Sequence, residues 1–472
     1  MKRRNFIQSM GIIGAGTLIS KTKVFAATPQ FPIVRVAADK RHFTSQAVEN
    51  AIAKFSSNVN DKELVWLFGN CFPNTLDTTV YYSEENGTPD TYVITGDIDA
   101  MWMRDSSAQV WPYMQFAKED PKVHNLIAGV INRQKGYILE DSYANAFYKN
   151  PEEKSEWISD HTKMRPGIHE RKWEIDSLCY PIRLSYHFWK STGDTKPFDK
   201  KWVDAMQTVY NTFVDQQKKQ NDGQYHFQRT TANATDTQPM SGYGYPVNPV
   251  GLISSAFRPS DDATLLSFLI PSNLFAVVSL NQAAEMLDAI SHETELATKM
   301  RQLSNEVKNA VYKYGIVKHP QFGKVFAFET DGFGGHILMD DANVPSLLAL
   351  PYLGAISTND SIYKNTRKFV WSKSNPFFYQ GTAAEGIGGP HVGKDMIWPM
   401  SLIIRGLTSS NDAEIKQSIE MLKRSHADKG FMHESFNKDD PKKFTRSWFA
   451  WTNTLFGEFL WKVFNEKPTL LN

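Results

Sequence analysis

The residues of this sequence that are best suited to chemistry are carboxylates set among aromatic and basic side chains. Asp261 and Asp262 adjoin an apolar run in FRPSDDATLLSFLIP, and Glu434 lies between Phe and Met residues in GFMHESFNKDD. Two carboxyl groups can act together as general acid and general base, one donating a proton and the other removing one. Hydrolysis of a glycosidic bond needs such a pair, with one acid to protonate the leaving oxygen and one carboxylate to activate water or attack carbon.

Motifs of other chemistries are missing from the sequence. It contains no HExxH, no His or Cys cluster at metal-ligand spacing, no G-x-S-x-G elbow and no P-loop. Asp97-Ile98-Asp99 reads as D-x-D, which holds a metal in sugar-nucleotide transferases, but alone it is a weak signal. The glycines of GTAAEGIGGPHVG do not match a dinucleotide fingerprint. We therefore expect neither a metal nor a cofactor.

A structural explanation of the Ser-Asp-Asp stretch must be weighed against the catalytic one. Ser260 or Asp261 could cap a helix that begins near Asp262, because Ser and Asp are preferred N-caps. A helix N-terminus would stabilise an ionised carboxylate, whereas a general acid needs a pKa raised above about 3.9. The charge of Asp262, a second carboxylate or apolar walls would raise it. We expect Asp262 or Ser260 to serve the helix while Asp261 faces a bound sugar.

Composition narrows the class of partner. The 472 residues have a net charge of +1, which provides no electrostatic footprint for nucleic acid or a membrane surface. Aromatic residues make up 13%, an excess that suits stacking on sugars and equally suits a large core. There is no linker-like or low-complexity stretch. We expect a single-domain monomer that binds neither nucleic acid nor membranes, in which Cys71 and Cys179 form either a disulfide or two buried thiols.

The N-terminus has the pattern of an export signal. Lys2, Arg3 and Arg4 precede the weakly apolar MGIIGAGTLIS and the small residues of VFAAT. This pattern predicts a signal peptide over residues 1–26, and the paired arginines suit twin-arginine export although a Sec signal remains open. The apolar stretch is too short to span a bilayer stably. An amphipathic anchor that stays on the protein is the alternative. We expect residues 27–472 to be exported, to the periplasm or beyond.

The rest of the chain reads as helical. Apolar residues recur at helical spacing over 45–73, 105–117, 120–147, 173–192, 197–219, 271–291, 292–315, 342–353, 357–370, 393–408, 410–427 and 447–465. Strand candidates are short, such as TYVIT and KVFAFET, and no βαβ rhythm appears. The sequence predicts an all-α protein.

The order of the helices suggests how the carboxylates could meet. Stretches rich in Asp, Arg, Trp, Gly and Pro precede alternate helices: GDIDAMWMRDS, RKWEIDS, RPSDDAT, MDDANVPS, EGIGGPHVGKDMIWP and FMHESF…TRSWFAW. Helical hairpins closed into a ring would bring all of these to one rim, with short strands or irregular loops there. We therefore expect an (α/α)6 barrel. The alternative is an irregular helical protein whose polar loops are only caps.

Three of these stretches carry a family resemblance. GDIDAMWMRDS, FRPSDDAT…LIPSN and FMHESF resemble glycoside hydrolase family 125, the bacterial exo-α-1,6-mannosidases, in an order that covers nearly the whole mature chain. The resemblance implies an (α/α)6 barrel, no catalytic metal, and removal of terminal α-1,6-linked mannose from mannosides or N-glycan-type oligosaccharides with inversion. It places the general acid on Asp261 and the general base on Glu434. Inversion requires the two carboxyl groups to stand roughly 6.5–9.5 Å apart.

Further residues of the polar stretches are candidates for binding sugar hydroxyls or for forming the walls of the sugar site. They are Asp97, Trp102, Arg104, Asp105, Arg258, Asp262, Asn343, His391 and His433. Their structural alternative is an Arg–Asp pair beside a buried Trp, since such pairs are often purely structural.

Several candidates and two other functions stay open. Trp173, Glu174, Asp176, Asp340 and Asp341 are equally ambiguous, and Glu385 is the main rival to Glu434 as base. Another toroid glycosidase, such as a glucuronyl hydrolase or a glucoamylase-like enzyme, could use rim arginines to read a uronate. A non-catalytic glycan-binding protein would use the carboxylates for hydroxyl contacts.

Overall fold

The computed structural model describes residues 31–472. The predicted signal peptide, residues 1–26, lies outside the described residues. Contacts divide the chain at Ile33, and the unit Val34–Asn472 contains every element discussed below. No helix in the described part is both long and apolar enough to cross a bilayer.

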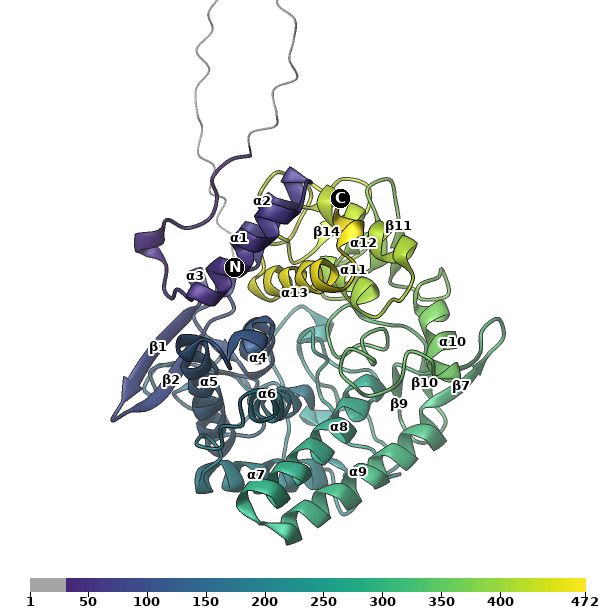
Figure 1. Ribbon diagram of the computed structural model, residues 1–472. Coiled ribbons are helices and arrows are strands. Elements are labelled where there is room, and N and C mark those ends of the chain that lie inside the picture. The colour runs from purple at the N-terminus through teal and green to yellow at the C-terminus, as the bar shows by residue number, and fades with distance from the viewer. Residues whose placement is uncertain (1–30) are drawn as a thin grey trace, which may run out of the picture. The chain divides into compact units, whose positions relative to one another are not determined.

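The unit Val34–Asn472 is mainly helical (Figure 1). Its α-helices are α1 (Gln46–Asn58), α2 (Lys62–Cys71), α3 (Asn74–Thr78), α4 (Met103–Val110), α5 (Pro121–Glu140), α6 (Asp176–Thr192), α7 (Lys200–Gln216), α8 (Ile270–Met286), α9 (Thr294–Tyr314), α10 (Ser361–Val370), α11 (Pro399–Leu407), α12 (Asp412–Ser425) and α13 (Ala450–Glu466). Short 3₁₀ or π turns extend some of them, as at Trp111–Phe116 and Leu287–Ser291. Each expected helical region contains a helix, with one exception described below, although the regions 120–147 and 393–408 also include the short strands Ala146–Phe147 and Met396–Ile397.

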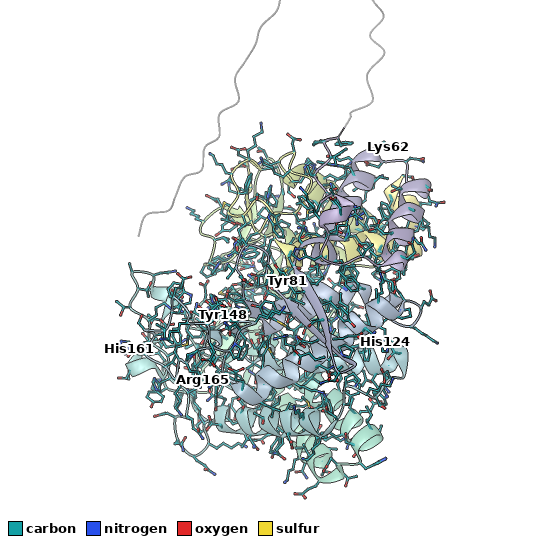
Figure 2. All side chains as sticks on the ribbon, turned by 90° about the vertical axis from the view of Figure 1, so that its left-hand side faces the viewer. Lys62, Tyr81, His124, Tyr148, His161 and Arg165 are labelled. Atoms are coloured by element: carbon teal, nitrogen blue, oxygen red, sulfur yellow. The ribbon has the colours of Figure 1, made fainter. Side chains whose placement is uncertain are left out.

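The strands are short and lie between helices. They are β1 (Val80–Glu85), β2 (Thr88–Val93), β3 (Met101–Trp102), β4 (Ala146–Phe147), β5 (Ile168–Glu170), β6 (Phe268–Leu269), β7 (Ile316–His319), β8 (Gly323–Phe326), β9 (Glu329–Thr330), β10 (His336–Ile337), β11 (Phe378–Gln380), β12 (Glu385–Ile387), β13 (Met396–Ile397) and β14 (Phe436–Asn437). The longest pair is the β1–β2 hairpin, which packs on α5 and carries Tyr81 (Figure 2).

Side-chain caps and burial patterns explain the helices. Asp61, Asp120, Asp199 and Asp360 accept first-turn N–H groups of α2, α5, α7 and α10. Helix α9 buries one stripe of Leu, Val, Met and Ala residues, as a helix on the outside of a core does. Helices α8 and α13 are buried on nearly every side. Such helices belong to the interior.

The buried helices pack on one another in a series. Helix α4 contacts α6, and α6 contacts α8; on the other side α11 contacts α13, and α13 contacts α4. Helices α5, α9, α12 and α2 lie outside them and pack on α6, α8, α11 and α13 (Figure 1). The series of inner helices has no regular helix between α8 and α11.

The expected helix over 342–353 is the exception, and its prediction was wrong. The carboxylate of Asp340 accepts the N–H groups of Leu347 and Leu348, so these donors are satisfied without a helix. Pro345 lacks an N–H and disfavours helical backbone before it. The segment packs against inner helices instead, because Tyr180 of α6 donates to the Val344 carbonyl.

The chemistry-bearing stretches precede the inner helices, as expected. Strand β3 ends where α4 begins, β6 ends where α8 begins, and β13 ends just before α11. Strand β5 leads toward α6, and β14 lies ahead of α13. We call the polar stretches that precede the inner positions, together with these strands, the lead-in segments. Three small sheets, β3-β4-β5, β6-β9-β10 and β13-β14, connect the lead-in segments to one another. The same end of each inner helix therefore faces the same region.

The two cysteines are free and buried. Cys71 ends α2, with its sulfur 3.7 Å from the Gly430 carbonyl, whereas Cys179 is on α6. Of the two alternatives for this pair, the structure has the buried thiols.

Close packing between α11 and α13 gives a stability prediction. A Cβ at Gly406 of α11 would stand 2.3 Å from the Phe459 ring, so Gly406→Ala should cost about 1–3 kcal/mol through overpacking. The matched control is Gly136→Ala on α5, where a Cβ meets nothing within 4 Å; it should stabilise by up to about 1 kcal/mol through helix propensity. Urea unfolding of both variants measures the difference. Equal effects would contradict the packing described here.

Candidate active site

The lead-in segments enclose one cavity at the centre of the unit. About 430 Å³ of empty space, part of it open to solvent, is lined by Thr95, Ile98, Trp102, Arg104, Asp105, Pro259, Ser260, Asp261, Asn343, His391, Trp398, Glu434, Arg446, Phe449 and Trp451. Seven of the predicted site residues are in this lining: Trp102, Arg104, Asp105, Asp261, Asn343, His391 and Glu434. The cavity therefore unites distant parts of the chain around two candidate catalytic carboxylates.

Asp261 sits on a tight hairpin and not at a helix start, which corrects the expectation of a cap. Phe257 and Ala263 form an antiparallel bridge, and helix α8 begins only at Ile270. The Asp261 N–H donates to the Arg258 carbonyl, and Asp261 has φ of 64°. This left-handed conformation is uncommon for a residue other than glycine. The turn of the hairpin places Asp261 in the lining of the cavity.

Glu329 holds this hairpin in place through hydrogen bonds. Its carboxylate accepts from Arg258 Nε at 2.7 Å and from the N–H groups of Leu265 and Leu266 at 3.0 Å each. Arg258, predicted to bind substrate, is therefore paired with Glu329 and is not among the residues that line the cavity. Ser260 donates to Asp341 at 3.2 Å and likewise caps no helix.

Arg104 lies at the centre of a carboxylate cluster. Its Nη1 is 2.5 Å from Glu174 Oε2 and 3.2 Å from Asp176 Oδ2, and its Nη2 is 3.1 Å from Asp261 Oδ1. Asp105 approaches its Nε at 3.4 Å. Four carboxyl groups thus surround one guanidinium. Asp105, Glu174 and Asp176 are almost completely buried, while a quarter of the Asp261 side chain is exposed.

The cluster cannot keep all four carboxylates ionised. Burial raises the pKa of Asp105 and of Asp176 to about 6, against the attraction of Arg104. Burial also raises the pKa of Glu174 well above its usual range. Burial alone would raise the pKa of Asp261 too, but Arg104 and Lys172 outweigh it and hold that pKa well below the usual range. Negative charge therefore concentrates on Asp261.

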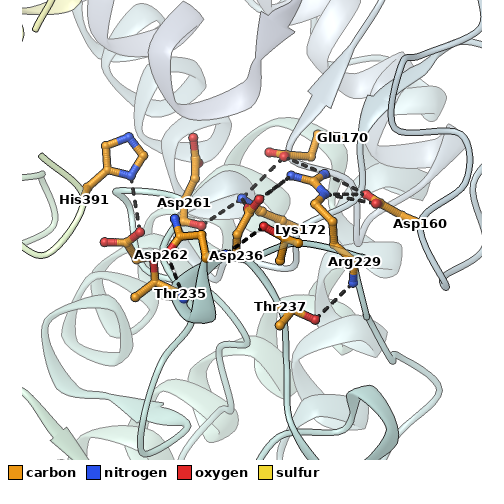
Figure 3. A network of polar contacts seen from close by, with 12 residues as sticks. Asp160, Glu170, Lys172, Arg229, Thr235, Asp236, Thr237, Asp261, Asp262 and His391 are labelled. Atoms are coloured by element: carbon orange, nitrogen blue, oxygen red, sulfur yellow. Dashed lines mark hydrogen bonds and ion pairs between the residues drawn. The ribbon is translucent and has the colours of Figure 1, made fainter. Parts of the chain in front are cut away.

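Lys172 connects Asp261 to a second network (Figure 3). Its Nζ donates to the Asp261 carbonyl at 2.9 Å and to Asp236 Oδ1 at 2.6 Å. Arg229 also binds Asp236 and, at 2.6 Å, Asp160. These ion pairs hold the loop after β5 against the hairpin. Sequence reasoning missed Lys172, whose only signal was its place within RKWEIDS.

His391 and Asp262 form a pair at the other side of the hairpin (Figure 3). His391 Nδ1 is 3.3 Å from Asp262 Oδ1. Burial would lower the pKa of His391, but the hydrogen bond and charge of Asp262, with the charges of Asp261 and Glu434, raise it to about 9. Asp262 therefore acts through His391, which carries a positive charge at the cavity wall near neutral pH.

Glu434 is held by Arg446 on the C-terminal lead-in segment. Its Oε1 is 3.5 Å from Arg446 Nε, and the same Nε is 3.4 Å from Asp97 Oδ2. Glu434 is nearly buried, with 6% exposed, although it lines the cavity. Asp97 is half exposed and reaches the site through Arg446 alone. Arg446 was not among the predicted site residues, and its only signal was its place in the stretch TRSWFAW.

His433, predicted to bind substrate, is not among the residues that line the cavity. It is fully buried, its Nδ1 lies 2.9 Å from the Ser447 carbonyl, and its ring stacks on Phe444. Its role is to hold the loop that presents Glu434. Glu385, the rival base, is also excluded, because it lies outside the lining and contacts Trp371 and Gln380.

Aromatic side chains form the remaining walls. Trp102, Trp398, Phe449 and Trp451 line the cavity, and Trp451 stacks on the Arg104 guanidinium at 5.9 Å. The indole N–H groups of Trp102 and Trp398 have no hydrogen-bond partner among the described residues. Trp173, Asp340 and Asp341 are engaged in structural hydrogen bonds. Trp173 is a core residue that donates to the Ser254 carbonyl, and Asp340 accepts a backbone N–H group of the 342–353 segment. Asp341 accepts from Ser260 and from the Asn343 amide.

Comparison with known proteins identifies this arrangement. A family described as metal-independent alpha-mannosidases, GH125, matches residues 61–461. The chain belongs to glycoside hydrolase family 125. It is therefore an α-mannosidase by family, and the residues 31–472 contain no group of three or more His, Cys, Asp or Glu side chains suited to hold a metal ion.

Individual relatives agree with this assignment. A Streptococcus pneumoniae structure, described as a metal-independent α-mannosidase in a non-productive complex with α-1,6-mannobiose, is 39% identical, with a TM-score of 0.87, and the match covers 90% of this chain and all of that one. The Meiotically up-regulated gene 157 protein of Schizosaccharomyces pombe is 40% identical over 94% of this chain and 90% of its own length. A bacterial glucoamylase bound to acarbose shares the fold alone, at 14% identity and a TM-score of 0.55, over 89% of this chain and 59% of that one.

The His391–Asp262 pair gives a pH prediction. The raised pKa means that charged His391 stabilises the fold fully below pH ~6.5, and that this contribution is lost as the pH rises through about 9. We expect the His391 imidazole to titrate near pH 9 in histidine-labelled NMR spectra. Asp262→Asn should lower that pKa, whereas Asp97→Asn, whose carboxylate pairs with Arg446, should change it less. A wild-type value at or below 6.5 would contradict the pairing.

Proposed function

We propose that this α-mannosidase is exo-acting and removes terminal α-1,6-linked mannose from mannosides or N-glycan-type oligosaccharides with inversion. The observation that carries the proposal is that Asp261 and Glu434, from different lead-in segments, line one cavity in a chain of family 125. The complex of the Streptococcus pneumoniae relative with α-1,6-mannobiose supports the linkage.

In the proposed mechanism, Asp261 is the general acid and Glu434 the general base. The terminal mannose binds between them, against the aromatic walls. As the bond to the leaving oxygen breaks, Asp261 transfers a proton to that oxygen. Glu434 removes a proton from a water molecule that attacks the anomeric carbon from the opposite face. The two carboxyl groups should then stand roughly 6.5–9.5 Å apart, which leaves room for the water.

The polar groups of the wall would bind the sugar without taking part in the chemistry. His391 offers a positively charged N–H, Asn343 an amide, and Trp102 and Trp398 unpaired indole N–H groups. Arg446 fixes the orientation of Glu434. A cavity closed behind the terminal sugar would make the enzyme exo-acting.

We propose that the helices form an (α/α)6 barrel in which the irregular segment 342–353 takes the sixth inner position. The series α11–α13–α4–α6–α8 supplies five inner helices. The segment and the stretch before it contact those ahead of α8 and α11: Ser260 donates to Asp341, and the Ala342 N–H donates to the Gly388 carbonyl. The segment also packs inward, on α6 through Tyr180 and on α13 through the hydrogen bond from Tyr352 to Glu458. Its lead-in stretch carries Asn343 into the cavity as the other lead-in stretches carry their residues.

The uronate-binding alternative has little support. It requires rim arginines that are available to a substrate carboxylate. Arg104 is surrounded by carboxyl groups, Arg258 is bonded to Glu329, and Arg446 contacts both Asp97 and Glu434. A neutral sugar suits this wall better. We expect the enzyme to act as a monomer.

Substitution of the two carboxylates tests the function and separates an enzyme from a glycan-binding protein. Asp261→Asn and Glu434→Gln should each lower kcat on α-1,6-mannobiose by about 10²–10⁴-fold, the usual contribution of a general acid or base. Glu385→Gln, outside the cavity, is the matched control and should keep kcat. An NMR time course should show β-mannose as the first product. Initial release of the α-anomer, or unchanged kcat in both variants, would overturn the assignment.

We also propose that the chain is exported after removal of residues 1–26. The basic start, short apolar core and small residues support this, as does their position before the family match. Expression of the full chain in a bacterial host should yield a periplasmic protein whose mass corresponds to a start near residue 27. Replacement of Arg3 and Arg4 by Lys should block export if the twin-arginine route is used. A full-length cytoplasmic product from the unaltered chain would contradict the proposal.

A further inference from the structure

The proposed acid faces a difficulty that the rest of the cluster resolves. A general acid must hold a proton at the start of the reaction, yet Arg104 and Lys172 favour the ionised form of Asp261. Some other group close to Asp261 must therefore keep the proton. The candidates are the buried carboxyl groups that share Arg104.

Glu174 is the carboxyl group placed to do so. It is fully buried at the start of α6, and its Oε2 accepts from Arg104 Nη1 at 2.5 Å and from Ser177 Oγ at 3.0 Å. Its Oε1 is buried and has no donor among the described residues. The Asp261 carboxyl is held by the same Arg104 guanidinium and is a side-chain hydrogen-bonding neighbour of Glu174. A buried carboxyl oxygen without a donor, next to a carboxylate, has the environment of a protonated acid that donates.

The surrounding charges favour one shared proton. The charged or titratable groups that face the Glu174–Asp261 pair include Arg104 and Asp105 from α4, Asp176 from α6, and His391 from the loop before α11. His169 from β5 and Lys172 from the segment after it also face the pair. Two carboxyl groups in contact do not both ionise in a buried site, and they titrate as a unit. One proton on the pair is the balanced state.

We propose that Glu174 stores the proton that Asp261 delivers to the glycosidic oxygen. This inference rests on the proposed function. Glu174 touches no substrate and is therefore a positioning residue for the proton. Binding of the sugar covers the exposed quarter of Asp261 and removes water from its charge, whereas ionised Glu174 keeps the bond to Arg104. The proton then moves from the Glu174 carboxyl to the Asp261 carboxylate.

The atoms balance over the cycle. The electron pair of the breaking C–O bond goes to the leaving oxygen, which takes the proton from Asp261. The water oxygen bonds to the anomeric carbon, and Glu434 takes the water proton. After product release, solvent returns one proton to the Glu174–Asp261 pair and removes one from Glu434.

The test uses Glu174→Gln and two substrates. Glutamine has the shape of the protonated acid and can donate to Asp261, but it has no proton to give up. With α-1,6-mannobiose, whose leaving group needs protonation, kcat/KM should fall by about 10²-fold or more. With 2,4-dinitrophenyl α-mannoside, whose leaving group departs without a proton, the fall should be less than about 10-fold, since general acid catalysis is what has been lost.

The pH profile supplies a readout that a merely structural role would not move. In the wild-type enzyme the pair keeps the acid loaded near neutrality, so activity on mannobiose should fall only at higher pH. In Glu174→Gln, Asp261 stands alone beside Arg104 and Lys172, and the alkaline limb should shift to lower pH. Asp176→Asn, whose carboxylate contacts the same guanidinium, is the matched control. It should lower kcat/KM by a similar factor on both substrates.

The outcomes separate this inference from the proposed function. Equal loss on both substrates, or an unshifted alkaline limb, in folded Glu174→Gln would overturn the proton store while leaving Asp261 and Glu434 in place. If that variant does not fold by circular dichroism, Glu174→Asp, which is too short to keep the same contact, must show the same leaving-group dependence, or the inference fails. Unchanged mannobiose hydrolysis in Asp261→Asn and Glu434→Gln would instead overturn the proposed function.

Discussion

One buried guanidinium organises this active site. Arg104 is shared by four carboxyl groups from α4, α6, the segment before α6 and the Asp261 hairpin, so negative charge exceeds positive charge in its immediate surroundings. Buried charges are costly unless they are paired and hydrogen-bonded. Some carboxyl groups of such a site must stay protonated near neutral pH, and a protonated carboxyl group is what general acid catalysis requires. The positions of the carboxyl groups around Arg104 decide which of them carries a proton and which carries a charge.

The remaining architecture serves to hold these groups at fixed distances. Glu329, on strand β9, fastens the hairpin through Arg258 and two backbone N–H groups, and Lys172 fastens it from the other side. His433 performs the corresponding task for the Glu434 loop. Lys172, Arg258 and His433 belong to the polar stretches and are of residue types that bind substrates in other proteins. In the structure they are supports, and the residues they support face the cavity.

The division into inner helices and lead-in segments explains how one fold can position so many polar groups. The helices are satisfied by their own hydrogen bonds and by packing, as for α8 and α13, which are buried on nearly every side. The segments before them are irregular, and their backbone groups are satisfied by short strand pairs and by side chains such as Asp340. Their side chains are thereby free to differ in direction, and the cavity forms where they converge.

The sequence alone determined the helices, because apolar periodicity reflects burial along a continuous segment, and it determined Asp261 and Glu434 as the acid and base candidates through motif resemblance. It did not determine that 342–353 is irregular, that Asp261 lies on a hairpin, or that Arg258 and His433 are supports. Those outcomes depend on partners far away in the chain, such as Glu329 for Arg258 and Ser447 for His433. A local pattern carries no information about such partners. The sequence alone also did not determine which carboxyl groups are protonated, because the pKa of each carboxyl group depends on burial and neighbouring charges that exist only in the folded chain.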